Sequence, residues 1–217
     1  MAEFEDTYKH KGLRKKLVEE IKSKGIRDEN VIEAVGKVPR HLFMDSSFLS
    51  FAYKDQAFPI EAGQTISQPY TVAFQTQLLE VEKGDKILEV GTGSGYQAAI
   101  LIEMGAKVFT IERQKKLYQK TQSLLPKLGY EARFFYGDGY KGLPGYAPFD
   151  KILITAGAPE IPEDLKKQLK SGGLLVAPIG GSGNQVMTSL KKTGQNQYEE
   201  KEHGYFVFVP LLPGRSG

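Results

Sequence analysis

The amino-acid sequence predicts a doubly wound α/β fold, with a mostly parallel seven-stranded sheet, helices on both faces and a helical N-terminal extension. From residue 83 onward, short apolar β-rich runs alternate with stretches long enough for helices, which is typical of βαβ units. A glycine-rich turn directly follows the first run, where doubly wound sheets bind ligands. The length of 217 residues suits one domain. We therefore expect a single domain over residues 1–217, with a helical and loop part over 1–80 and an α/β core over 81–217.

The composition excludes several classes of protein. There are no cysteines, which excludes disulfide frameworks, cysteine nucleophiles and thiolate metal sites. The three histidines (His10, His41 and His203) lie far apart in the sequence, so we expect no metal. The net charge of +3 is too small to indicate a nucleic-acid partner. The longest apolar run, over 205–213, contains proline and is shorter than the roughly 18 residues of a membrane helix, so we expect no membrane partner.

The N-terminal sequence indicates where the protein works. Residues 1–6 are acidic, whereas a secretory signal begins with basic residues followed by an apolar run. The sequence therefore predicts a cytoplasmic protein, and nothing in it requires more than a monomer.

Two helices are expected within the first 40 residues. The apolar side chains of the first recur at helical spacing, with basic residues around them: Leu13, Leu17, Val18 and Ile21 form the stripe. A basic helix can contact nucleic acid or an anionic membrane, but we favour a solvated face on a helix packed against the core. The second helix begins after Asp28, a candidate N-cap, and ends before Pro39.

Residues 40–70 show no sustained period of 2 or 3.6 but carry many aromatic side chains. Long loops in compact domains are usually functional or disordered, and the aromatic content argues against disorder. We expect an ordered functional loop region with short helical pieces; a lid that only covers the core is the alternative. A further helix is expected over 71–79.

The strands of the sheet are predicted from apolar, β-rich runs. Five of these runs lie at residues 86–90, 107–111, 132–136, 151–155 and 174–177. Helices are expected between some of them, over 96–104 and 114–128. Two more candidates, 186–191 and 205–209, follow without a helical spacer, and polar residues 193–202 connect them. We therefore expect an antiparallel hairpin at one edge of the sheet.

The glycine-rich turn reads Glu89-Val-Gly-Thr-Gly-Ser-Gly95. Glycine suits a backbone that turns sharply and approaches a ligand without a Cβ in the way. The dinucleotide fingerprint would place its third glycine at position 96, which is Tyr96 here. The observed spacing resembles the first motif of the class I methyltransferases, whose Rossmann-like sheet binds S-adenosylmethionine.

Two carboxylates follow the next strands. Glu112 ends the second strand, 21 residues after Gly91, from where it can accept hydrogen bonds from ribose hydroxyls. An exposed acid at the start of a helix explains Glu112 alone equally well, but the glycine loop favours the ribose. Asp138 follows the third strand, where class I methyltransferases commonly contact the adenine amine; an Asp-Gly turn with Gly139 is the alternative.

No catalytic base follows the fourth strand, which ends in Thr155-Ala-Gly-Ala-Pro159. The Asn/Asp-Pro-Pro-aromatic motif of amino-methylating enzymes is missing there. A carboxylate acceptor, with a pKa of about 4, needs no base at neutral pH. The polar loop Gly63-Gln-Thr-Ile-Ser67-Gln-Pro-Tyr70 precedes the helix over 71–79 and can also be its cap. Because no His–Asp pair accompanies Ser67, we exclude a serine hydrolase.

Seven segments occur in the order found in the protein-L-isoaspartate O-methyltransferases, which this sequence therefore resembles from about residue 10 to residue 212. They are residues 38–43, 63–70, 89–97, 137–139, 155–159, 168–173 and 208–211. The departures are small: Gly157 stands where many members have alanine, and the tail after Leu211 differs from that of longer relatives.

The resemblance implies methylation of the α-carboxylate of L-isoaspartyl residues in damaged peptides and proteins, followed by closure to a succinimide. It implies S-adenosyl-L-methionine as methyl donor, S-adenosyl-L-homocysteine as product, and Ser67 as the active-site residue. The implied cofactor positions are Thr65, Ile66, Ser67, Gly91, Thr92, Gly93, Gly95, Glu112, Asp138 and Gly139. For the substrate peptide we expect Thr65, Ser67, Tyr70, Val209 and Pro210, with the peptide beside a strand edge near Val209.

Three other functions share parts of this pattern. A methyltransferase of RNA or of a small molecule would keep the cofactor half and differ over 38–80. A nicotinamide oxidoreductase is disfavoured by Gly95 and Tyr96. A binding module without chemistry is disfavoured by the intact Thr-Ile-Ser loop.

Overall fold

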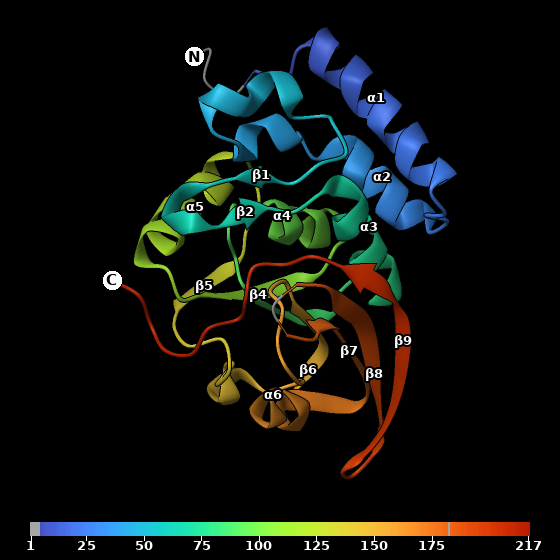
Figure 1. The fold of residues 1–217 in the computed structure, drawn as a ribbon, viewed down its shortest axis with the longest axis vertical. Coiled ribbons are helices and arrows are strands. Elements are labelled where there is room, and N and C mark those ends of the chain that lie inside the picture. The colour runs from blue at the N-terminus through green and yellow to red at the C-terminus, as the bar shows by residue number, and fades with distance from the viewer. Residues whose placement is uncertain (1–4, 182) are drawn as a thin grey trace.

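The computed structural model describes residues 5–181 and 183–217. Its main feature is a seven-stranded sheet in the order β5-β4-β3-β6-β7-β8-β9. The strands are β3 (Lys86–Val90), β4 (Lys107–Glu112), β5 (Arg133–Tyr136), β6 (Phe149–Ile154), β7 (Leu169–Ile179), β8 (Gln185–Gly194) and β9 (Gln197–Phe206). The pairs from β5 to β7 are parallel and the last two are antiparallel. This confirms the predicted fold class (Figure 1).

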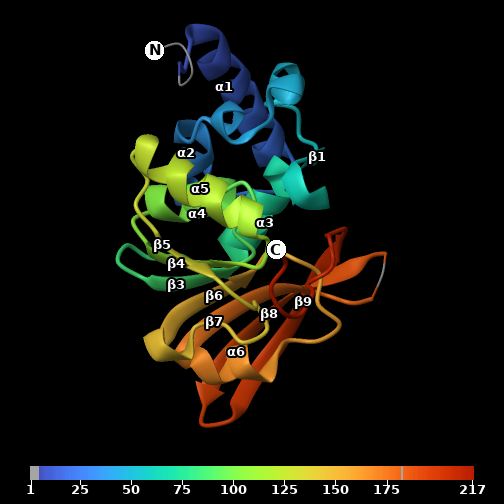
Figure 2. The ribbon, with the colours of Figure 1, turned by 90° about the vertical axis from the view of Figure 1, so that its left-hand side faces the viewer.

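The helices divide unequally between the two faces of the sheet (Figure 2). One face carries α1 (Tyr8–Ser23), α2 (Glu29–Lys37), α3 (Pro69–Leu78), α4 (Tyr96–Glu103) and α5 (Lys115–Lys127). The other carries the short α6 (Glu163–Gln168). Neighbouring residues of a strand point to opposite faces, so Ile87 packs in the core under the first group and Leu88 in the core beside α6.

The N-terminal helices follow the predicted pattern with one difference. Asp28 caps α2 as expected, accepting hydrogen bonds from the backbone amides of Asn30 (2.9 Å) and Val31 (3.3 Å). In α1 the expected apolar stripe is displaced: Leu13 is exposed, and Arg14 is buried instead. Arg14 is accommodated because its guanidinium donates hydrogen bonds to Asp6, Tyr53 and the carbonyl of Gly36. None of the described helices is long and apolar enough to cross a membrane.

Residues 40–68 form an ordered region of short elements, as the aromatic content predicts. They are the 3-10 helices η2 (Arg40–Phe43), η3 (Ser46–Phe51) and η4 (Glu61–Gly63), and the two-stranded sheet of β1 (Phe58–Pro59) and β2 (Thr65–Ile66). A further 3-10 turn, η5 (Pro144–Tyr146), precedes β6. The pairing of Phe58 with Ile66 brings the chain back toward α3.

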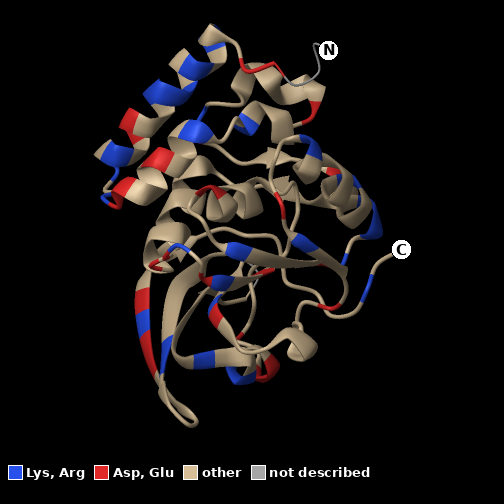
Figure 3. Ribbon diagram, turned by 180° about the vertical axis from the view of Figure 1, so that it is seen from behind, with Lys and Arg blue, Asp and Glu red and all other residues tan. Residues whose placement is uncertain are grey.

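The C-terminal hairpin is present, but its predicted boundaries are wrong. Residues 193–202, expected to be a connection, contain the end of β8 and more than half of β9, and the turn between these strands needs only Gln195 and Asn196. Asn196 has φ +57°, a conformation that suits a tight hairpin turn. Charged side chains over 199–202 are exposed along this edge strand (Figure 3). Charges discourage pairing of an edge strand with another chain. Because of them the sequence of β9 also lacks the alternation of apolar and polar residues from which a strand is predicted.

Candidate functional site

A pocket opens beyond the carboxyl ends of β3, β4 and β6, where a doubly wound sheet binds its ligand. Its open mouth included, it measures about 750 Å³. We call it the glycine-loop pocket, because the turn after β3 forms its floor. The expected site residues that line it are Thr65, Ile66, Ser67, Gly91, Thr92, Gly93, Glu112, Gly139, Val209 and Pro210.

The glycine loop contains two positions at which any residue other than glycine would be strained. Gly91 and Gly93 have φ of +101° and +52°, values that side chains rarely tolerate. A Cβ at Gly91 would lie 2.5 Å from the hydroxyl oxygen of Thr155, which donates hydrogen bonds to the carbonyls of Val90 (2.9 Å) and Gly91 (2.7 Å). The loop is therefore held against β6 and leaves its upper side open.

Gly95 has a different position from the other two glycines. It precedes α4 with φ +85° and is not among the residues that line the pocket. A Cβ there would lie 2.6 Å from Thr121 and 2.8 Å from Leu125, so Gly95 permits close packing of the loop against α5. Its expected role in binding the cofactor stays a prediction.

Glu112 lies in the wall of the pocket and holds the glycine loop. One carboxylate oxygen accepts the backbone N–H of Gly93 (2.9 Å) and the other that of Gln114 (2.8 Å). The side chain is buried, which contradicts the alternative of an exposed acid. Each carboxylate oxygen can accept more than one hydrogen bond, so Glu112 can keep the loop in place and still accept two ribose hydroxyls.

Glu89 was not predicted as a site residue, yet it is a fully buried carboxylate beside the pocket. Thr110 donates a hydrogen bond to one of its oxygens (2.5 Å), and the Thr110 hydroxyl lies 2.6 Å from that of Thr92, which lines the pocket. The other oxygen has no hydrogen-bond partner within the described chain. Burial raises the pKa of Glu89 from 4.5 to about 8, and the nearby charge of Glu112 adds to this effect.

The raised pKa of Glu89 predicts a pH-dependent stability. Between pH 5 and pH 8 the folded protein keeps a proton that the unfolded chain releases, so stability falls as the pH rises. We expect Glu89→Gln to remove this dependence: its melting temperature should rise relative to that of the wild type from pH 5 to pH 8. Glu199→Gln, at an exposed position, is the control and should follow the wild type. Parallel curves for all three proteins would show that Glu89 does not bind this proton.

Tyr96 and Arg40 form a second feature that the sequence did not predict. Tyr96 lines the pocket, and the guanidinium of Arg40 lies over its ring, 5.0 Å from the centroid. Both side chains are fully buried, and burial lowers the pKa of Arg40 to about 10. A cation over a desolvated ring is stabilising. Arg40, which does not line the pocket itself, therefore helps to hold Tyr96 in the pocket wall.

Ser67 lies where the glycine-loop pocket meets a second cavity. This cavity, the aromatic groove, runs between α3 and the end of β9 and is lined by Tyr70, Phe74 and Phe206. The rings of Tyr70 and Phe206 are stacked with their centroids 6.4 Å apart. Thr65 and Ser67 line both cavities. Gln68 stands at the N-cap of α3 and Pro69 is its first residue, so the end of this loop does start the helix, as the alternative held, and Ser67 lies just before the cap.

Val209 and Pro210 lie just beyond the edge strand and not within it, and the expected position of a peptide beside this strand edge stays a prediction. The strand β9 ends at Phe206, and the chain then crosses to the end of β6. There the backbone N–H of Gly157 donates to the carbonyl of Val209 (2.8 Å), and that of Leu211 donates to the carbonyl of Gly157 (2.7 Å). Val209 still lines both cavities, and Pro210 lines the glycine-loop pocket.

Asp138 forms the turn that was considered as an alternative for it. Its carboxylate accepts the backbone N–H of Tyr140 (3.0 Å). Gly139, and not Asp138, lines the pocket, and a Cβ at Gly139 would lie 2.6 Å from Val90. The close approach of Gly139 to β3 therefore shapes the pocket, and contact between Asp138 and an adenine amine stays a prediction.

His10 and His41, distant in the sequence, are stacked with their ring centroids 3.8 Å apart. With Asp6 they form a group whose ligand atoms lie within 4.8 Å of one another. These atoms already have protein partners: Arg14 donates two hydrogen bonds to Asp6 (3.0 and 2.8 Å), and His41 is bonded to Tyr53 (2.7 Å). The group therefore fastens α1 to the region that follows α2.

Comparisons with known proteins agree with this architecture. A family model described as "Protein-L-isoaspartate(D-aspartate) O-methyltransferase" matches residues 12–216. Protein-L-isoaspartate O-methyltransferases of Christiangramia forsetii and Flavobacterium psychrophilum are each 59% identical over 214 residues, covering 98% of this chain and all of theirs.

Two solved structures are similar over most of this chain. One, a protein-L-isoaspartate O-methyltransferase, has a TM-score of 0.83 and 30% identity; the alignment covers 91% of this chain and 65% of that one. The other, a beta-aspartate methyltransferase from Plasmodium falciparum in complex with S-adenosyl-L-homocysteine, has a TM-score of 0.80 and 26% identity, with 92% and 98% covered.

Proposed function

Because the chain belongs to the protein-L-isoaspartate(D-aspartate) O-methyltransferase family, we propose that it methylates L-isoaspartyl residues in damaged peptides and proteins. The methyl group comes from S-adenosyl-L-methionine and is placed on the α-carboxylate of the isoaspartyl residue. The ester then closes spontaneously to a succinimide, whose hydrolysis returns some normal aspartate. The observation that carries the proposal is the position of Thr65 and Ser67, which line both the glycine-loop pocket and the aromatic groove.

The glycine-loop pocket fits the methyl donor. The close contact between Gly91 and Thr155 holds the loop against β6, so a ligand can lie directly on the backbone of the loop. The buried carboxylate of Glu112 faces the same pocket. Gly91, Thr92 and Gly93 would hold the methionine portion, Glu112 the ribose, and Gly139 with Asp138 the adenine. When bound, the donor supplies a methyl group on a positively charged sulfur.

The acceptor makes a catalytic base unnecessary. An α-carboxylate is ionised at neutral pH, since its pKa is about 4 or below. One carboxylate oxygen forms a bond to the methyl carbon as the carbon–sulfur bond breaks, and the electron pair of that bond stays on sulfur, which becomes a neutral thioether. Ser67 donates a hydrogen bond to the carboxylate and aims one oxygen at the methyl group. Such alignment can supply on the order of 7–11 kcal/mol of the barrier.

The aromatic groove is the proposed site of the peptide on either side of the isoaspartyl residue. It begins at Ser67 and passes Tyr70, Phe74 and Phe206. Aromatic side chains offer a large apolar face and, in Tyr70, a polar hydroxyl group. Such a surface can contact different neighbouring residues, which suits substrates that arise by chemical damage at many sites. We further propose that residues 1–217 act as one domain and as a monomer, since one chain supplies both cavities. No metal is needed, because neither reactant requires further activation. Cytoplasmic location stays a prediction.

The test is transfer of labelled methyl from S-adenosyl-L-methionine to an L-isoaspartyl peptide, with bulk RNA as the competing acceptor. We expect label on the peptide only, in a form that mild alkali releases, because a carboxyl ester hydrolyses whereas methyl groups on nitrogen do not. Alkali-stable label, or label on the RNA, would favour the alternative of a methyltransferase with another substrate.

A further inference from the structure

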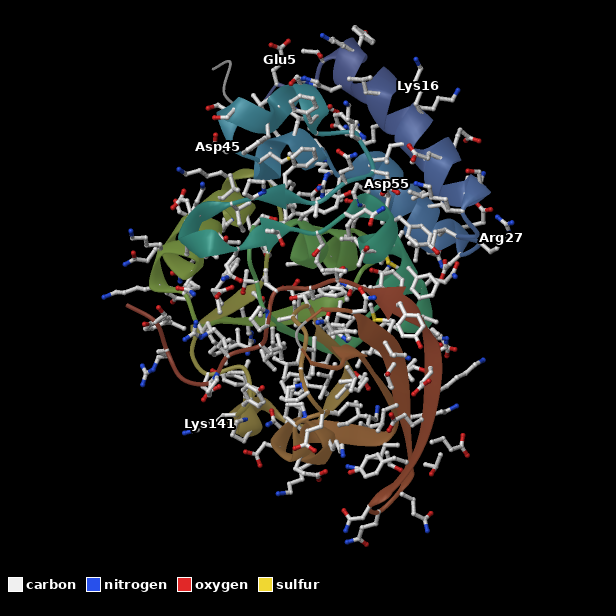
Figure 4. All side chains as sticks on the ribbon, in the orientation of Figure 1. Glu5, Lys16, Arg27, Asp45, Asp55 and Lys141 are labelled. Atoms are coloured by element: carbon white, nitrogen blue, oxygen red, sulfur yellow. The ribbon has the colours of Figure 1, made fainter. Side chains whose placement is uncertain are left out.

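A buried carboxylate lies at the base of the loop that carries Ser67. The side chain of Asp55, labelled in Figure 4, is only 2% exposed and lies at the N-terminal end of α3. One of its oxygens accepts the backbone N–H of Tyr70 (2.7 Å). The other accepts the side-chain amide of Gln68 (2.9 Å) and the ammonium of Lys24 (2.6 Å), which reaches it from the end of α1. These contacts hold both sides of the turn into α3.

Asp55 replaces the missing cap of α3. The first amides of a helix need acceptors, which the N-cap side chain usually provides, but Gln68 makes no such bond within the described structure. Asp55 provides it from a position 15 residues earlier. Its negative charge is also favourable at the positive end of a helix. The start of α3, and with it the residue before Gln68, is therefore fixed by a side chain outside the loop.

The contact between Asp55 and Tyr70 also closes the segment that carries Thr65 and Ser67. Asp55 precedes β1 and Tyr70 follows β2, so residues 56–69 form a closed loop with its ends joined. Within it, Phe58 pairs with Ile66, and the amide of Ile60 donates to the carbonyl of Gln64 (2.8 Å). Ser67 lies between this pairing and the bond at Tyr70, so its backbone is held on both sides.

The charge of Asp55 is balanced where it is buried. Lys24 donates hydrogen bonds to Asp55 (2.6 Å) and to Glu20 (2.7 Å). A buried carboxylate without a partner is costly, so the ammonium of Lys24 offsets the cost of burying Asp55 beneath the loop. The helical N-terminal part is in this way connected directly to the loop.

We propose that Asp55 is a positioning residue for methyl transfer, and that it acts by fixing the direction of Ser67. This inference rests on the proposed function. The reaction depends on alignment more than on acid–base chemistry, and a misplacement of about 1 Å can lower a rate by about 10²-fold. Asp55 lines neither the glycine-loop pocket nor the aromatic groove, so it acts through Tyr70 and Gln68.

The first test compares two aspartates that both cap helices. In Asp55→Ala we expect turnover at saturating peptide and cofactor to fall by about tenfold or more, with the Kd for S-adenosyl-L-homocysteine unchanged. Asp28→Ala removes the cap of α2 and should lower the melting temperature without lowering turnover below the melting transition. Asp55→Asn keeps an oxygen for the amide of Tyr70, so it should recover a large part of the turnover lost in Asp55→Ala.

Wild-type turnover in Asp55→Ala overturns the proposal. So does a loss of turnover in Asp28→Ala equal to that in Asp55→Ala, or a loss of affinity for S-adenosyl-L-homocysteine in Asp55→Ala that parallels its loss of turnover. A second measurement, hydrogen–deuterium exchange over residues 64–70, needs no substrate. We expect faster exchange there in Asp55→Ala and unchanged exchange in Asp28→Ala; unchanged exchange in both contradicts the proposed hold on the loop. A wild-type chain that is inactive on isoaspartyl peptide contradicts the proposed function itself, and the exchange result still decides whether Asp55 fixes the loop.

Discussion

Replacing Ser67 by alanine should lower turnover on an isoaspartyl peptide by about 10²-fold, because a positioned hydrogen bond to the reacting group is lost. The affinity for S-adenosyl-L-homocysteine should stay nearly unchanged. Ser67 stands at the junction of the two cavities, where it can orient the acceptor carboxylate. The measurement is steady-state methyl transfer together with calorimetric titration of the product cofactor.

Ser67→Thr is the matched variant for this experiment. It keeps a hydroxyl at the same position and adds one methyl group, so it should retain much more activity than Ser67→Ala. Equal losses of turnover and cofactor affinity in Ser67→Ala would assign Ser67 to the cofactor instead. Normal turnover in Ser67→Ala would remove Ser67 from the mechanism.

Replacing Glu112 by alanine should have the opposite signature, with weaker binding of S-adenosyl-L-methionine as the first effect. Hydrogen bonds to a charged group contribute about 1.5–3 kcal/mol each. The loss of two to the ribose therefore predicts a Kd that increases by about 10²-fold or more. The variant also loses the bonds from the amides of Gly93 and Gln114, which loosens the floor of the pocket. Calorimetric titration with S-adenosyl-L-methionine measures the effect.

Glu112→Gln separates the two roles of this side chain. Its amide oxygen can accept a hydrogen bond from one of the two backbone N–H groups. Its NH₂ group then faces the other backbone N–H group, from which it cannot accept a hydrogen bond. We expect a Kd between those of the wild type and Glu112→Ala. If the cofactor affinity of Glu112→Ala is normal, the assignment of Glu112 to the ribose is wrong.

The sheet was predictable because its strands are buried. The runs that became β3, β4 and β6 are mostly apolar and most of their side chains are buried, as expected of parallel strands covered on both faces. Their predicted ranges fit the observed ones to within one or two residues. In β9 the charged residues of an exposed edge carry no such pattern, and the range was misplaced. The sequence also offered no sign that, among the described residues, α1 to α5 would cover one face of the sheet and α6 the other.

The part of the glycine-loop pocket that comes from one short segment of the sequence was predictable. Gly91 and Gly93 lie together in the sequence and in the pocket, and Glu112 follows the neighbouring strand. Glu89 lies in the same motif, but only its burial shows that it is unusual. Asp55 was missed because its partners, Lys24 and Tyr70, are 31 and 15 residues away. Contacts of this range leave no periodic pattern in a single sequence.

The central claim is that the acceptor is the misplaced backbone carboxylate of an isoaspartyl residue. Two peptides that differ only in an L-isoaspartyl or an L-aspartyl linkage at one position test it most directly, through kcat/KM for methyl transfer to each. The account predicts transfer to the isoaspartyl peptide and none above background to its aspartyl isomer. Equal transfer to both peptides, or transfer to neither, would contradict it.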